Sequence, residues 1–322
     1  MQDTTDLIIK AINYQYPEQI PIILGFLPAA MKQNGREIRK IAAGYPDLLG
    51  DKWLEYDPEK DMPASYRYGG FTDAWGCVWS NEQEGMEAYV TGHPLKKRED
   101  IRSFEAPKID DGLHHGFMYL RILDLRGFEE AMLDFAEECE EIQILIDKVC
   151  EYNVRQMKLI CQKHNSELIF TGDDLGMQRG IAIGAAKWRK YFKPAFKKIY
   201  DVCHGYGKYV FMHTDGDIIE IMPDLVDTGV DIINPQYRAN GIDRLVETCK
   251  GRIPIMLDLD RQLFPHASPS ELREHIRETV KRMYMPQGGF GINVEIGMEV
   301  PMENVEAIID EIDKIRLYKG KT

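Results

Sequence analysis

Apolar runs of strand length alternate regularly with helix-length amphipathic segments through the second half of this 322-residue chain. The runs are ELIFTGDD (167–174), YVFMHTDGD (209–217), DIINPQ (231–236), IPIMLDLD (253–260) and FGINVE (290–295). Such alternation predicts parallel strands joined by right-handed crossovers, and continuous apolar strands fit a sheet that is covered on both faces. The sequence therefore favours the α/β class.

An earlier apolar run, IPIILGF near residue 21, and weaker candidates raise the expected count to roughly eight strands, as in a closed (β/α)8 TIM barrel. An open doubly wound sheet is the alternative, but the first strand is not followed by G-x-G-x-x-G and the chain contains no GxxxxGK[ST]. Residues 45–115 are rich in Tyr, Trp, Gly, Pro and Asp, and helical patterns follow to about residue 164. We expect a single barrel domain over residues 1–322, with a cap and helical elaboration at about 45–165.

The composition excludes some classes of partner. A net charge of -13 argues against a nucleic-acid or anionic membrane surface, because these partners require clustered Lys and Arg. No cationic start precedes an apolar core at the N-terminus, so we expect a cytoplasmic protein. The six cysteines lack C-x-x-C spacing, and we expect reduced thiols. Cys139, Cys150 and Cys161 recur every eleven residues, which favours buried positions on one helix stripe over a metal or redox site.

Every readable strand ends on polar side chains, where parallel βα folds place their reactive groups. These residues are Asp173, Asp174, His213, Asp215, Asn234, Gln236, Asp258, Asp260, Asn293 and Glu295. Carboxylates that converge on one mouth need a metal, a cation or substrate hydrogen bonds to offset the cost of burial. Asp also suits turns and helix N-caps, so capping and pocket roles both remain open for Asp173 and Asp174.

His213 and Asp215 are separated by one residue, which places both side chains on the same side of a continuing strand. An imidazole nitrogen with a carboxylate suits zinc, provided that another strand end supplies a third ligand. Glu295 is the first candidate for that ligand, and Asp173, Asp258 and Glu299 are the alternatives. A His213 hydrogen-bonded to Asp215 or to a backbone group in a metal-free pocket is the other interpretation.

Several of these segments carry a resemblance to a known family. GDDLGMQ, KWRKYFKPAFKKIYDVCHGYGKYVFMHTDGDI, LVDTGVDIINPQ, PIMLDLDRQ and GGFGINVEIGMEVPMENVEAI resemble the uroporphyrinogen decarboxylase superfamily from about residue 168 to 308, with DAWGCVW and QIPIILGF agreeing upstream. The resemblance implies a (β/α)8 barrel. It also implies one of two chemistries, a cofactor-free decarboxylation or a cobalamin-dependent methyl transfer with zinc held by an H-x-C pair and a later Cys.

This sequence departs from both patterns. GFLPAAMKQNGREIRK lacks the paired-arginine cluster that would hold a porphyrinogen, His213 is followed by Asp215 in place of Cys, and INVEIGMEV contains no Cys. Oxygen ligands in place of thiolates would leave zinc a stronger Lewis acid, which suits an ether oxygen better than a thiol. The chain is similar in this respect to the ether-cleaving methyltransferases of anaerobic O-demethylation, which belong to anaerobic one-carbon metabolism.

The resemblance therefore implies a methyltransferase that moves a methyl group from a methoxy compound, such as an aromatic methyl ether, to the Co(I) of a separate corrinoid protein. We expect His213, Asp215 and Glu295 to hold zinc as a Lewis acid. The residues expected to act on or bind the substrate are Asp173, Asp174 and Asn234 as catalytic groups and Gln178, Gln236, Asp258, Asn293 and Trp75 as substrate-binding groups. A cofactor-free decarboxylase and a non-catalytic barrel that binds a corrinoid or tetrapyrrole are the alternatives, and a homodimer is left open.

Overall fold

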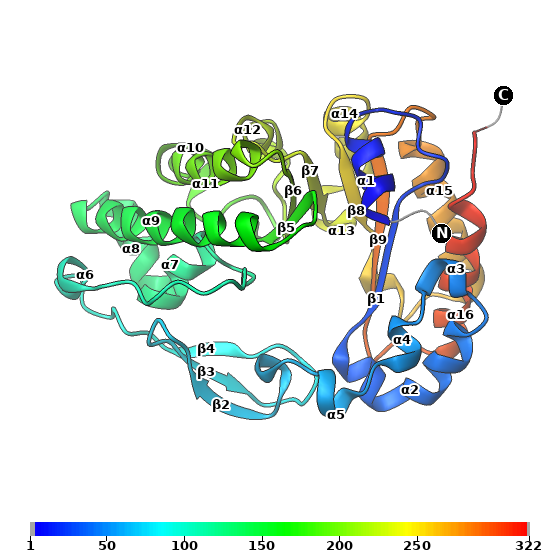
Figure 1. Cartoon of the computed structure of the whole chain (residues 1–322), viewed down its shortest axis with the longest axis horizontal. Helices are drawn as coiled ribbons and strands as arrows, with labels where there is room; N and C mark the ends of the chain where they lie inside the picture. The colour runs from blue at the N-terminus through cyan, green and yellow to red at the C-terminus, as the bar shows by residue number, and fades with distance from the viewer. Residues whose placement is uncertain (1–3, 321–322) are drawn as a thin grey trace. The chain divides into compact units, whose positions relative to one another are not determined.

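The computed structural model describes residues 4–320, and the chain divides into two compact units. Unit 1 contains the residues up to Gly70, Ser80–Tyr89 and the residues from Gly241 onward, and unit 2 contains Phe71–Trp79 and Val90–Asn240. Figure 1 labels the helices and strands along the chain. The prediction of a single domain over residues 1–322 stays a prediction.

Unit 2 is built on three parallel strands in the order β7-β6-β5. Their bounds are β5 (Leu168–Gly172), β6 (Tyr209–Thr214) and β7 (Ile232–Pro235). The helices of this unit are α6 (Asp100–Ser103), α7 (Tyr119–Arg126), α8 (Phe128–Glu137), α9 (Glu140–Lys163), α10 (Gly184–Tyr191), α11 (Lys193–Gly205), α12 (Met222–Asp227) and α13 (Tyr237–Asn240). Helices α9 and α11 lie side by side (Figure 1).

The alternation of strands and helix-length segments predicts one helix before the run that begins at residue 209, and the structure has two there. Helix α10 ends at Tyr191, and α11 begins at Lys193 with Pro194 in its first turn. A proline has no N–H to donate and is tolerated at a helix start, so it separates the two helices instead of continuing one. Trp188, Phe196 and Tyr200 from these helices are fully buried and supply much of the unit 2 core.

Unit 1 holds the other three parallel strands, in the order β1-β9-β8. Their bounds are β1 (Ile22–Phe26), β8 (Ile255–Asp258) and β9 (Phe290–Ile296). The helices are α1 (Thr4–Ile12), α2 (Pro28–Ala42), α3 (Pro46–Leu49), α4 (Lys52–Glu55), α5 (Pro58–Asp61), α14 (Ile242–Cys249), α15 (Pro269–Met283) and α16 (Met302–Ile315). A capping box formed by Ser268 and Glu271 starts α15.

The α/β class and the parallel strands predicted from the sequence are confirmed, and each of the six apolar runs contains one parallel strand. The region expected to form a cap holds three short strands, β2 (Gly69–Thr72), β3 (Val78–Asn81) and β4 (Tyr89–Gly92), before helices α7 to α9. Residues 4–320 contain six regular parallel strands where the sequence suggested roughly eight. Next to β5, the segment before α7 contributes a single backbone bond, from Gly116 N–H to the Gly172 carbonyl at 2.8 Å.

Candidate metal centre

The strand register of unit 2 arranges side chains in layers on one face of the sheet. Gly172 lies opposite His213, and His213 lies opposite Asn234. Paired residues of parallel strands point to the same face, so these three positions form one layer. Phe170 and Phe211 form the layer two residues earlier, with ring centroids 4.8 Å apart. The loops that carry Asp174 and Asp215 begin where this register ends.

Asp174, His213 and Asp215 bring one carboxylate oxygen, one imidazole nitrogen and a second carboxylate oxygen within 4.8 Å of one another. His213 Nε2 lies 3.2 Å from Asp215 Oδ1 and 4.0 Å from Asp174 Oδ1. We call these three residues the metal-ligand cluster. It confirms that His213 and Asp215 share one side, and it adds Asp174, which the sequence analysis had assigned as a catalytic group.

Asn234 determines which nitrogen of His213 faces the carboxylates. Its Oδ1 lies 2.8 Å from His213 Nδ1 and accepts a hydrogen bond, so Nδ1 carries a hydrogen and a neutral ring presents the Nε2 lone pair to Asp174 and Asp215. Three acceptors facing one another repel unless a positive charge lies between them. A metal ion bound between the three atoms would supply that charge. Asn234 is 2 % exposed, and this bond orients the His213 ring; its predicted direct role toward substrate stays a prediction.

His115 is a fourth polar residue at this position, and its Nε2 lies 3.0 Å from Asp174 Oδ2. Burial lowers the pKa of His115, but the hydrogen bond and charge of Asp174 outweigh it and leave that pKa above its ordinary value. Burial has the opposite effect on Asp174, and His115 overcomes it, so the pKa of Asp174 lies below its usual range. Asp174 is therefore ionised, and its second oxygen, Oδ1, accepts the Asp215 N–H at 3.0 Å.

Asp173 faces away from the cluster and starts helix α7. Its carboxylate accepts the backbone N–H groups of Met118, Tyr119 and Leu120, and its side chain is fully buried. These are donors that a helix start leaves without partners inside the helix. Burial raises the pKa of Asp173 to about 7, although the N–H donors oppose this shift. Both oxygens of Asp173 thus cap the start of α7, and its predicted catalytic role stays a prediction.

The loop after β6 is held in place by amide side chains from the β7 end. Gln236 Oε1 accepts the Gly216 N–H at 3.0 Å, and the buried Asn240 accepts the Ile218 N–H and donates to the Gly216 carbonyl, both at 3.0 Å. Gly216 has φ 84°, and a Cβ there would overlap the backbone of Gly176 in the loop after β5. Gln236 therefore fixes the loop that carries Asp215, and its predicted contact with substrate stays a prediction.

The strand ends of unit 1 carry their own cation. Arg261 forms an ion pair with Glu295, and its Nε lies 3.8 Å from Asp258 Oδ2. Asn293 donates a hydrogen bond to Asp258, which is 1 % exposed. The predicted substrate-binding pair Asp258 and Asn293 thus make a bond with each other, and the predicted zinc ligand Glu295 is paired with a guanidinium. A role for Glu295 as a further ligand of a metal at His213 stays a prediction.

Two other predicted substrate contacts lie in different surroundings. Trp75 is buried, stacks on Phe104 and meets Tyr152 edge-on, with the Arg121 guanidinium 5.2 Å from its ring centre. The predicted contact between Trp75 and substrate stays a prediction. Gln178 is exposed at the tip of the turn between Met177 and Gly180, and its predicted role stays a prediction.

Sequence reasoning missed His115, Asn240, Arg261 and the space left by Gly172. The predicted site residues lie at the ends of apolar runs, and His115 follows no such run. The pair HisHis between the glycines at 112 and 116 was nevertheless a visible signal. Arg261 directly follows the strand end LDLD, so a search for cations beside the predicted carboxylates would have found it. Asn240 lies in a short helix and had no signal of its own.

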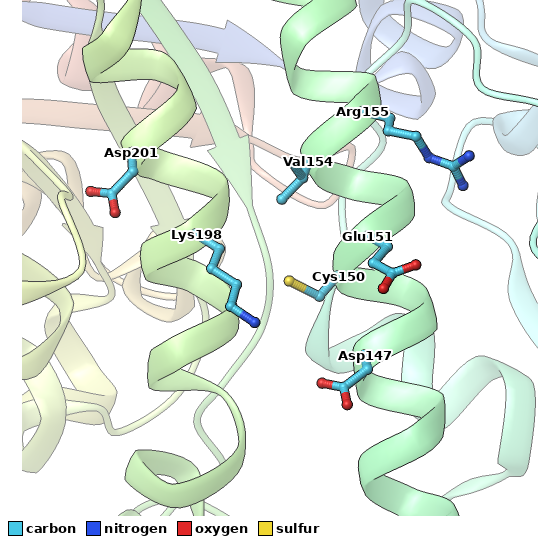
Figure 2. Close-up of a pocket in the computed structure, with 7 residues that line it drawn as sticks. All are labelled: Asp147, Cys150, Glu151, Val154, Arg155, Lys198 and Asp201. Carbon is cyan, nitrogen blue, oxygen red and sulfur yellow. The ribbon is translucent and has the colours of Figure 1, made fainter.

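A pocket of about 750 Å³ lies elsewhere in unit 2, between α9 and α11. Figure 2 shows Cys150 of α9 and Lys198 of α11 directed into this space, with Asp147, Glu151, Val154, Arg155 and Asp201 around it. Cys150 and Cys161 are buried in α9, which confirms the core interpretation for these two. All six cysteines are free thiols. None of the seven lining residues belongs to the metal-ligand cluster.

The family profile described as Uroporphyrinogen decarboxylase (URO-D) matches residues 121–315, which is more than half of the chain. The chain belongs to the URO-D family. The matched residues include β5 to β9 and all three residues of the metal-ligand cluster. No curated protein sequence matches the chain.

Solved structures support the fold of this URO-D family member. A methyltransferase from Methanosarcina mazei is similar with a TM-score of 0.63 at 15% sequence identity, and the similarity covers 97% of this chain and 99% of that chain. At this identity the match shows a shared TIM-barrel-like fold. Dihydropteroate synthase from Xanthomonas albilineans, solved with 4-aminobenzoic acid, reaches a TM-score of 0.34 at 15% identity over 52% of this chain and 61% of that chain, a level that carries no argument. Among residues 4–320, no helix has the length and apolar character needed to cross a membrane.

Proposed function

We propose that this URO-D family member is a methyltransferase that transfers a methyl group from a methoxy compound to the Co(I) of a separate corrinoid protein. We further propose that Asp174, His213 and Asp215 hold a zinc ion. One observation carries the proposal, namely the convergence of three acceptor atoms within 4.8 Å. Membership of the family and a fold shared with a methyltransferase are consistent with this reaction class.

The residues present fit zinc in number and in chemistry. Zinc in catalytic sites is held by three protein side chains with one open position, and imidazole nitrogen and carboxylate oxygen are both common ligands. The hydrogen bond from His213 Nδ1 to Asn234 is the outer contact that a metal-bound histidine needs, because it fixes the ring orientation and directs Nε2 to the ion. Oδ1 of Asp174 and Oδ1 of Asp215 lie 4.0 and 3.2 Å from His213 Nε2.

In the overall reaction, the bond between the methyl carbon and oxygen breaks with its electron pair on the oxygen, and Co(I) supplies both electrons of the new methyl–cobalt bond. Zinc in this position would supply a Lewis acid that stabilises the negative charge left on that oxygen. The protein contributes the arrangement of ligands. Asn234 orients His213, and the Asp215 N–H and His115 together hold Asp174 by its two oxygens.

An aromatic substrate is favoured by the layer next to His213. Phe170 is 50 % exposed and packs against Phe211 on the same face of the sheet as His213. An exposed phenylalanine beside a polar cluster offers a flat apolar surface against which an aromatic ring can stack. We therefore propose an aromatic methyl ether as the methyl donor, with Phe170 in place of Trp75 as the aromatic contact.

A cofactor-free decarboxylase is the second candidate, and the ion pair between His115 and Asp174 is the observation that favours it. A protonated imidazole held beside a carboxylate is an acid and base pair that could return a proton to carbon after CO2 leaves. The two candidates differ in their need for metal. A decarboxylase of this kind keeps its activity in a strong chelator.

The deciding experiment begins with the zinc content of the purified chain, for which we expect about one ion per chain. The protein is then mixed with a reduced corrinoid protein and a panel of methoxylated aromatics, and the absorption spectrum of methylcobalt is followed. Removal of zinc should abolish the transfer, and added zinc should restore it. Turnover of a carboxylated substrate with release of CO2 by metal-free protein would overturn the proposal in favour of the second candidate.

A further inference from the structure

The segment that carries His115 is fixed to the end of β5 by two kinds of hydrogen bond. Gly116 N–H donates to the Gly172 carbonyl at 2.8 Å. The Asp173 carboxylate accepts the N–H groups of Met118 and Leu120 at 3.0 and 2.9 Å. Residues 116–120 are therefore held at the end of β5. His115 gains a defined position from these bonds although it belongs to no helix or strand.

Gly172 leaves the space in which the His115 ring lies. This glycine occupies the same layer as His213 and Asn234, where a side chain would otherwise point to the cluster. A Cβ added at Gly172 would collide with Nδ1 of His115, and the three atoms nearest to that position all belong to the His115 ring. The imidazole of His115 thus takes the place that β5 leaves empty. Its ring centre is 5.7 Å from that of His213.

Asp174 is held at both oxygens. His115 Nε2 reaches Oδ2 at 3.0 Å, and the Asp215 N–H reaches Oδ1 at 3.0 Å. Without His115 the carboxylate would be held at Oδ1 alone and would be free to rotate away from His213. Metal ligands that are carboxylates are commonly oriented by such a hydrogen bond to the oxygen that does not bind the ion.

We propose that His115 is a positioning residue of the metal centre, which orients Asp174 for metal binding from the slot that Gly172 leaves open. The proposal rests on the metal site proposed above and adds to it an outer contact from a segment outside the barrel strands. His115 acts through Asp174 and is not itself a ligand. Its loss should weaken zinc binding without changing the number of ligands.

The test measures zinc affinity by competition with a chromophoric chelator for the wild-type chain and three variants. We expect His115→Ala to bind zinc about 10- to 100-fold more weakly, as other outer contacts of metal sites do. His115→Gln should recover most of that loss, because its amide can donate from nearly the same position. His114→Ala is the matched control, since His114 is exposed and 3.8 Å from its partner Asp110, and it should bind like wild type.

Gly172→Ala is a further variant, and it tests the position of the His115 ring without changing His115 itself. We expect it to weaken zinc binding as His115→Ala does, because the new methyl group displaces the ring. In the His115→Ala background, Gly172→Ala should weaken zinc binding little further, because the His115 ring that the new methyl group would displace is already absent. If the losses of zinc affinity in the two single variants simply add in the double variant, Gly172 does not act by leaving space for the His115 ring.

Cobalt in place of zinc separates the possible roles of His115. The visible spectrum of Co(II) reports the ligand set, so it should keep its band positions in His115→Ala if the residue only positions Asp174. A changed ligand set would overturn the positioning role. Tight zinc binding by wild type with an unchanged affinity in His115→Ala would overturn this inference alone. A wild-type chain without zinc affinity would overturn both the inference and the proposed function.

Discussion

The strand ends of the two units neutralise their carboxylates in different ways. In unit 1, Arg261 lies beside Glu295 and Asp258. In unit 2, the ion-pair partners of Asp174 are the imidazoles of His115 and His213. A guanidinium is a permanent cation, whereas an imidazole can lose its proton and present a lone pair.

This difference shows which polar strand end can accept an exchangeable ion. Unit 1 carries a fixed charge that no metal needs to replace. The metal-ligand cluster of unit 2 requires a positive charge between its three acceptors, and a metal ion bound there would supply it. A structural ion pair and a candidate metal centre therefore differ in the kind of cationic side chain beside the carboxylates more than in the number of carboxylates.

The largest effect is expected for His213→Ala, which removes the only nitrogen of the cluster. We expect zinc affinity to fall by more than about 100-fold, since even the loss of an outer contact costs 10- to 100-fold. Zinc per chain after gel filtration and chelator competition measure the change. His204→Ala is the control, because His204 lies 3.0 Å from Asp231 and outside the cluster. Unchanged zinc affinity in His213→Ala would show that the cluster is not the metal site.

Asp173→Ala should produce the largest loss of stability among the acids at the strand ends. It removes the acceptor of three backbone N–H groups at the start of α7 and leaves them buried. We expect a loss of about 2 to 4 kcal/mol in the free energy of unfolding. Urea denaturation in the presence of a chelator measures it without a contribution from metal.

Asp174→Asn is the matched comparison for that measurement, because the two residues are adjacent and differ in what they contact. It should weaken zinc binding and change the free energy of unfolding little. The interpretation of Asp173 as a capping residue fails if Asp173→Ala lowers zinc affinity while its stability equals that of wild type.

Arg261→Ala tests the fixed charge of unit 1. We expect a loss of about 1 kcal/mol in the free energy of unfolding, a small value because the side chains of Arg261 and Glu295 are 33% and 39% exposed. Zinc affinity should stay at the wild-type level. Lys281→Ala removes an exposed pair with Glu278 and is a control with an even smaller effect. A change in zinc affinity in Arg261→Ala would support the prediction that Glu295 is a metal ligand.

Much of the fold was predictable because parallel strands are apolar over their whole length. The six runs found in the sequence each contain one parallel strand, since the hydrophobic pattern depends on burial and is local. The break between α10 and α11 and the path of the segment before α7 were not predicted. Both depend on local backbone chemistry, at Pro194 and at Asp173, that a search for hydrophobic periods does not register.

The site was predictable in part for a related reason. His213 and Asp215 could be paired because their spacing along one strand decides their direction. Which of Asp173 and Asp174 faces the site could not be decided, because the strand ends at Gly172 and the backbone beyond it follows no period. His115 was missed because it follows no apolar run, and its place at the site depends on a contact with Asp174, which is 59 residues away in the chain.

Alkylation of Cys150, which lines the pocket between α9 and α11, is expected to have the smallest effect on zinc affinity. Burial raises the pKa of the Cys150 thiol to about 11, so the thiolate is scarce near neutral pH. At pH 8 we expect alkylation of Cys150 to be about 100-fold slower than that of an exposed thiol, and to accelerate as the pH rises toward 11. Mass spectrometry of digested protein locates the modified residue, with Cys150→Ser as the control.

Modification of Cys150 should leave zinc affinity unchanged, because the residues that line this pocket are separate from the metal-ligand cluster. Unit 2 thus contains a thiol, Cys150, that is buried between packed helices and an imidazole, His213, that belongs to the candidate metal centre. Fast alkylation at pH 8 would mean that α9 and α11 open more readily than their packing suggests. A loss of zinc on alkylation would mean that the two regions are coupled, and the contrast between a packing site and a binding site within unit 2 would no longer hold.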